Sequence, residues 1–78
     1  MPDRLSQNGG GRLLLAGRTL KAGEEIEVIV GGNWHRATVL KPRRVQRLWI
    51  GELLLDTGRI MGAVGLIGRG SEGEKQTT

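Results

Sequence analysis

Residues 23–40 constrain the fold more than any other stretch of this sequence. Ile26, Val28 and Val30 are separated by single residues, Glu27 and Ile29, and are preceded by Glu25, which is the two-residue period of a strand with one buried face. Gly31 and Gly32 follow, and glycine accepts the positive φ angles that tight hairpin turns require. A second alternating run over residues 34–39 completes the pattern, so this stretch predicts a β-hairpin.

The register of this hairpin depends on the length of its loop. A two-residue loop, either Gly31-Gly32 or Gly32-Asn33, keeps the apolar faces of the two strands together, whereas a three-residue loop would turn Arg36 into the core. We therefore predict the two-residue loop. In its Gly31-Gly32 version, Glu27 faces Arg36 and Ile29 faces Trp34. The residues expected inside are Ile26, Val28, Val30, Ala37 and Val39, with His35 half-buried on the same face.

The rest of the chain reads as short strands joined by glycine-rich corners. Fourteen of the 78 residues are glycine, which favours turns and strand bends over helices. Further strands are expected over residues 12–16, 45–52, 53–55 and 59–68, where residues 53–55 form either a strand of their own or the far half of a long bent one. The sequence therefore predicts an all-β fold, a small antiparallel barrel of about five strands spanning residues 12–69. Residues 1–11 are expected to form a flexible arm, and residues 70–78 a disordered polar tail.

The composition argues against several classes of function. There is no cysteine, so neither a disulfide nor a thiolate metal site can form. The single histidine, His35, has no nucleophile or carboxylate at a spacing that suggests a catalytic pair. We expect no enzymatic activity, cofactor or metal. No apolar run is long enough for a signal peptide or a membrane span, so we expect a cytoplasmic protein without a membrane partner.

One stretch carries an unusual concentration of positive charge. From Arg36 to Arg47 there are five basic residues and no acidic one, and four of the five are arginines, whose planar fork suits phosphate. We predict contact with nucleic-acid phosphates here, against the alternative of an ordinary solvated loop. Trp34 either stacks on bases or covers Ile29, and Trp49 is expected to fill the barrel. The predicted nucleic-acid-binding residues are Arg36, Lys41, Arg43, Arg44, Arg47 and Trp34.

A second hypothesis rests on apolar runs that break the alternation. Residues 13–15 and 53–55 are each three consecutive leucines, and alternate side chains of a closed barrel face water. Leu14, Leu54 and Met61 are therefore predicted to form a surface that docks a protein partner or a second copy of the chain.

Two stretches resemble SH3-like barrels of the Tudor type. Residues 34–39, Trp-His-Arg-Ala-Thr-Val, resemble the Trp-Tyr-Arg-Ala-x-Val strand of that group, and residues 53–59, Leu-Leu-Leu-Asp-Thr-Gly-Arg, resemble its strand ending in Asp-Tyr-Gly-Asn. Residues 12–69 are also similar to small uncharacterised bacterial SH3-like domains, some of them carried on mobile elements. The resemblance implies a barrel but no particular function. His35 and Thr57 stand where Tudor domains place tyrosines, so an aromatic cage for methylated side chains is not expected.

Overall fold

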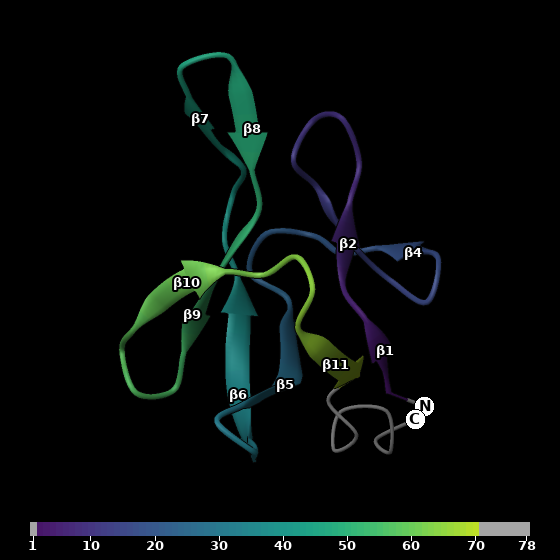
Figure 1. Ribbon diagram of the computed structural model, residues 1–78, viewed down its shortest axis with the longest axis vertical. Helices are drawn as coiled ribbons and strands as arrows, with labels where there is room; N and C mark the ends of the chain where they lie inside the picture. The colour runs from purple at the N-terminus through teal and green to yellow at the C-terminus, as the bar shows by residue number, and fades with distance from the viewer. Residues whose placement is uncertain (1, 71–78) are drawn as a thin grey trace.

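The computed structural model describes residues 2–70, and this part of the chain forms eleven short strands and no helix (Figure 1). The strands are β1 (Asp3–Arg4), β2 (Ser6–Gln7), β3 (Leu13–Leu15), β4 (Arg18–Thr19), β5 (Glu25–Val30), β6 (Asn33–Val39), β7 (Arg43–Val45), β8 (Leu48–Ile50), β9 (Glu52–Leu55), β10 (Ile60–Gly62) and β11 (Ile67–Gly70). Every pairing is antiparallel. The all-β prediction is confirmed. Except for Gly70, the tail predicted for residues 70–78 lies outside the described residues.

The β5–β6 hairpin has the predicted register. Val30 pairs with Asn33 across the turn Gly31-Gly32, and both glycines have positive φ. Four of the five residues expected inside, Ile26, Val28, Ala37 and Val39, are buried, and Val30 is partly buried against them. This hairpin makes the most extensive strand pairing of the fold and supplies two adjacent strands of its largest sheet.

The strands form three separate sheets rather than the expected closed barrel. The largest has six strands in the order β1-β11-β5-β6-β9-β10, so that β1 and β10 are its two edges and the sheet is open. Residues 59–68 were expected to make one closing strand. Instead the chain turns at Val64-Gly65, and β10 and β11 join opposite sides of the sheet. The smaller sheets are β2-β3-β4 and β7-β8.

One core joins the six-stranded and three-stranded sheets. Leu13 and Leu15 of β3 point into it, whereas Leu14 between them is only partly buried. Leu5 is just 1% exposed and belongs to the same core, although residues 1–11 were expected to be a flexible arm. The difference arises because β1 pairs with β11 on one side of Leu5 and β2 pairs with β3 on the other, which fixes its backbone. The remaining buried members are Leu20, Ile26, Val28, Ala37, Val39, Leu53, Leu55 and Ala63.

The β7–β8 hairpin departs furthest from expectation. A continuous strand was predicted over residues 45–52, but the chain reverses at Gln46-Arg47 and pairs residues 43–45 with residues 48–50. Gln46 has a φ of 60° and Arg47 is not among the residues with positive φ, which matches a type II′ turn. Figure 1 shows this hairpin projecting from the body along the long axis of the molecule.

Candidate nucleic-acid interface

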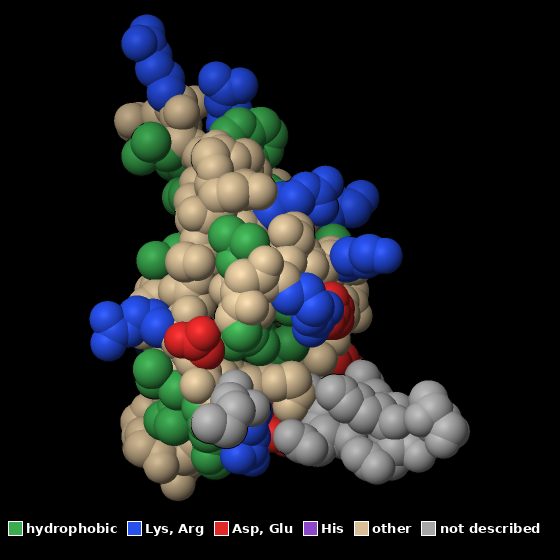
Figure 2. Space-filling view, turned by 90° about the vertical axis from the view of Figure 1, so that its right-hand side faces the viewer, with side chains coloured by type: hydrophobic (Ala, Val, Ile, Leu, Met, Phe, Trp, Pro, Cys, Tyr) green, Lys and Arg blue, Asp and Glu red, His purple; other side chains and the backbone are tan. Residues whose placement is uncertain are grey.

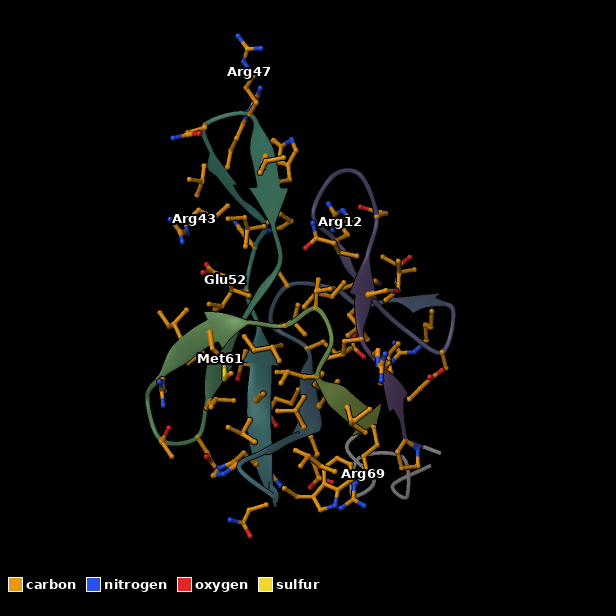
Figure 3. All side chains as sticks on the ribbon, in the orientation of Figure 1. Arg12, Arg43, Arg47, Glu52, Met61 and Arg69 are labelled. Atoms are coloured by element: carbon orange, nitrogen blue, oxygen red, sulfur yellow. The ribbon has the colours of Figure 1, made fainter. Side chains whose placement is uncertain are left out.

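The β7–β8 hairpin is a projecting ribbon that carries most of the predicted basic residues. Arg44 lies on β7, and Lys41 lies in the segment that leads into β7. Arg47 lies in the turn, at the tip of the hairpin (Figure 3). All three are exposed, and within residues 2–70 none of them has a carboxylate at ion-pair distance. Figure 2 shows Lys and Arg side chains but no Asp or Glu on the upper, projecting part of this face. The hairpin therefore presents uncompensated positive charge.

Arg43 differs from its basic neighbours because it forms a two-point ion pair with Glu52 of β9. Its Nε and Nη2 atoms donate to the two carboxylate oxygens of Glu52, each at 3.1 Å (Figure 3). The side-chain hydrogen bond from Arg43 lowers the pKa of Glu52. This pair joins the base of the hairpin to the six-stranded sheet and neutralises Arg43, which makes Arg43 a poorer candidate for phosphate contact than Lys41, Arg44 or Arg47.

Arg12 joins the basic surface from a distant part of the sequence. It is the last residue of the β2–β3 loop, beside the hairpin (Figure 3), and it is exposed. A groove of about 350 Å³ is lined by residues of both the loop and the hairpin, and we call it the basic groove; its lining residues are Gly10, Arg12, Ala22, Lys41, Pro42 and Trp49. Arg12 could not be assigned to this surface from the sequence, because nothing in its local pattern indicates which distant segment lies beside it.

Trp49 forms one wall of the basic groove instead of filling a barrel. Trp49 is 40% exposed. The Cζ atom of Arg44, its cross-strand partner on β7, lies over the indole ring at 5.7 Å from the ring centroid. Arg44 and Trp49 therefore share one face of the ribbon, whereas Leu48, which is 70% exposed, pairs with Val45 on the other face. An aromatic ring thus stands among three cationic side chains, those of Arg12, Lys41 and Arg44.

The base of the hairpin is held to the body by a side chain and a glycine. Gln7 of β2 donates from Nε2 to the Trp49 carbonyl at 2.9 Å and accepts at Oε1 from the Gly51 amide at 3.0 Å, as a neighbouring strand would. Gly11 has a φ of 82°, and a Cβ there would lie 2.9 Å from the Trp49 Cβ and 3.0 Å from the Pro42 Cβ. Since a two-stranded ribbon is marginal alone, these contacts explain how it keeps a defined orientation.

Two residues of the predicted site, Trp34 and Arg36, do not lie near the hairpin. Both are on β6, and Trp34 is seven residues from Lys41 along nearly extended chain, roughly 23 Å at the rise of a strand. The Trp34 ring is covered by Arg69, whose Cζ lies 3.8 Å from the ring centroid. Arg69 also donates to Glu27 at 2.8 Å, so the partner of Glu27 is Arg69 and not Arg36, which only faces it across the hairpin. Trp34, Arg69 and Glu27 therefore form a cluster at the end of the molecule opposite the hairpin, where Figure 3 places Arg69.

The predicted apolar surface is divided between two sheets. Leu14 lies on β3, whereas Leu54 and Met61 lie on β9 and β10. All three are partly buried, and Met61 packs against the core. Leu54 pairs directly with Ile60, which is 57% exposed on the edge strand β10. An exposed apolar site therefore exists at this edge, with Ile60 as its most exposed member.

His35 has a carboxylate partner that its sequence spacing did not reveal. Its Nδ1 lies 3.0 Å from Oδ1 of Asp56, and the hydrogen bond with His35 lowers the pKa of Asp56. Within residues 2–70 no third His, Asp or Glu joins them in an arrangement that could hold a metal ion. No helix long and apolar enough to cross a membrane occurs in this part of the chain either.

Comparison of this chain with protein-family models, with curated proteins and with solved structures finds no match. The functional hypothesis therefore depends on the geometry of the hairpin and its surroundings.

Proposed function

We propose that this protein is a non-enzymatic binding module that contacts nucleic-acid phosphates through the β7–β8 hairpin. The observation that carries this proposal is the uncompensated positive charge of the hairpin, with Arg44 and Arg47 on the ribbon and Lys41 at its base. Two-stranded β-ribbons fit nucleic-acid grooves, and arginine forks bind phosphate in two-point geometry. Arg12 adds a fourth cation from across the basic groove.

Attachment of the ribbon to the body supports this proposal. Phosphate contacts need cations at defined positions, and the Gln7 hydrogen bonds and the Arg43–Glu52 pair fix the base from which Arg44 and Arg47 project. We propose Lys41, Arg44, Arg47 and Arg12 as the contact set, with Arg43 as a positioning residue. We also propose that the chain is related to SH3-like domains, with an open sheet in place of their closed barrel. This relation adds no residue to the contact set.

A mobility-shift assay tests the proposal. The wild-type protein is expected to retard single-stranded and duplex probes at low salt, and the double variant Arg44→Gln, Arg47→Gln to retard them less. Arg59→Gln is the matched control, because Arg59 lies in the exposed β9–β10 turn, away from the hairpin. Failure of the wild-type protein to bind any probe, or equal weakening by the control, would refute the proposal.

A second candidate function is self-association through the edge of the six-stranded sheet. Strand β10 is an edge strand, and its Ile60 exposes apolar surface beside Leu54. Open strand edges and exposed apolar residues favour pairing with another chain. Sedimentation of the wild-type protein and of Ile60→Lys at micromolar concentrations tests this candidate. A dimer that Ile60→Lys dissociates supports it, and a wild-type monomer excludes it.

A further inference from the structure

Trp49 separates two grooves of different chemistry. On one side lies the basic groove of about 350 Å³, bordered by the charged side chains of Arg12 and Lys41. On the other side lies a groove of about 490 Å³ that no charged residue lines; its lining residues are Gln7, Leu48, Trp49, Ile50, Gly51, Gly62, Ala63 and Val64. Of these two grooves in the described part of the chain, the basic groove is the one that combines an aromatic wall with cations at its rim.

The size and walls of the basic groove indicate what it can hold. Its volume lies at the lower end of the roughly 300–1,000 Å³ typical of small-ligand sites. That space suits one nucleotide but not a base-paired step. The Trp49 ring and the Pro42 ring offer apolar surface to a base, while Arg12 and Lys41 lie where the attached phosphates would be neutralised. A base can enter such a groove only when it is unpaired.

We infer that the ligand of the proposed function is a single-stranded nucleic acid, with one base stacked on Trp49 in the basic groove. The inference rests on the proposed function, which it narrows from phosphate contact in general to recognition of an unpaired strand. Arg44 lies on the same face of the ribbon as Trp49, so a strand whose base enters the groove can continue toward the hairpin tip and Arg47. Binding is expected to tolerate any base, because every base has a stacking face.

Tryptophan fluorescence tests this inference directly. The chain has two tryptophans, so Trp34→Phe leaves Trp49 as the sole emitter, and phenylalanine keeps an aromatic ring beneath Arg69. Oligo(dT) and oligo(U) are expected to quench Trp49 emission by stacking, and comparison of the two separates DNA from RNA. A duplex of equal length is expected to bind through the hairpin with little quenching. Binding of the single strands without quenching would contradict the inference.

Substitutions in the groove provide the second measurement. Stacking is worth about 1–3 kcal/mol per base, so Trp49→Leu should weaken single-strand affinity about 5- to 150-fold and leave duplex affinity nearly unchanged. Arg12→Gln changes only an exposed side chain, so it tests the groove even if Trp49→Leu perturbs the hairpin. It should weaken single-strand binding more than duplex binding, whereas Arg59→Gln should change neither.

The outcomes separate this inference from the proposed function. If Trp49→Leu and Arg12→Gln weaken single-strand and duplex binding equally, or not at all, while Arg44→Gln, Arg47→Gln still weakens binding, the groove does not hold a base and only the inference fails. If no probe binds the wild-type protein, both fail.

Discussion

Replacing Gln7 by alanine is expected to loosen the β7–β8 hairpin. The change removes both side-chain hydrogen bonds to the base of the ribbon. The Gly51 amide loses its acceptor at a buried residue, whereas water can replace the bond to the Trp49 carbonyl, which is exposed. An unsatisfied buried donor costs about 1–3 kcal/mol, and because this bond is only partly buried we expect a loss of about 1–2 kcal/mol in the free energy of unfolding.

Thermal denaturation followed by circular dichroism measures this loss. For a chain of this length, about 1 kcal/mol corresponds to a change of roughly 4–8 °C in Tm. Ser6→Ala is the control, since Ser6 is the exposed neighbour of Gln7 on the same strand and should change stability by less than about 0.5 kcal/mol. Hydrogen exchange should show faster exchange of the hairpin amides in Gln7→Ala. Equal Tm values for the two variants, with unchanged hairpin exchange, would refute the assigned role of Gln7.

Three further predictions concern the core, a close contact and acid stability. Leu5→Ala should lower the free energy of unfolding, measured in urea, by about 2–5 kcal/mol, because Leu5 is a core leucine. A negligible effect would instead support the expectation that residues 1–11 form a flexible arm. Gly51→Ala should lower the free energy of unfolding by about 1–3 kcal/mol, because a Cβ there would lie 2.6 Å from Cδ2 of Leu13 and 2.8 Å from the Gly11 carbonyl oxygen. Unchanged stability would show that these neighbouring atoms can shift without cost. The hydrogen bond with His35 lowers the pKa of Asp56 in the folded protein. The Asp56 carboxylate therefore stabilises the fold fully above its unfolded pKa of about 3.8, and this contribution is lost as pH falls through the lower folded pKa. Asp56→Asn should therefore flatten the decline of stability in this acid range, and an unchanged urea midpoint-versus-pH curve would contradict the pairing.

The central hairpin could be predicted because its sequence specifies its register at two levels. The alternation of residues 25–30 fixes which face is buried, and the paired glycines at 31–32 fix the loop length, so the two signals agree. The β9–β10 turn at Asp56–Gly58 was predictable for the same reason, since Asp and Gly are typical turn residues.

The β7–β8 hairpin could not be predicted because its turn has no such signal. Gln46 and Arg47 are not typical turn residues, and Gln46 takes a positive φ that non-glycine residues rarely adopt. Without a visible turn, the run from Val45 to Glu52 reads as one strand. Trp49 was accordingly assigned to the core, although the hairpin places it at the surface.

Long-range pairing explains the remaining differences. Leu5 is a single apolar residue among polar ones, and its burial depends on partners more than 60 residues away, in β11. Arg12 and Lys41 line one groove only because the β2–β3 loop folds against the hairpin. The basic charge of residues 41–47 was visible in the sequence, but which of these arginines is neutralised depends on where Glu52 lies.

The salt dependence of binding tests the central claim most directly, because it counts the phosphates that the hairpin and the neighbouring Arg12 neutralise. Four contacts, from Arg12, Lys41, Arg44 and Arg47, predict a slope of about −2.8 in the log–log plot of affinity against salt for a single strand. The double variant Arg44→Gln, Arg47→Gln should halve the slope to about −1.4, while Arg59→Gln should leave it unchanged. A slope near zero for the wild-type protein, or the same slope for the wild type and the hairpin variant, would contradict the account.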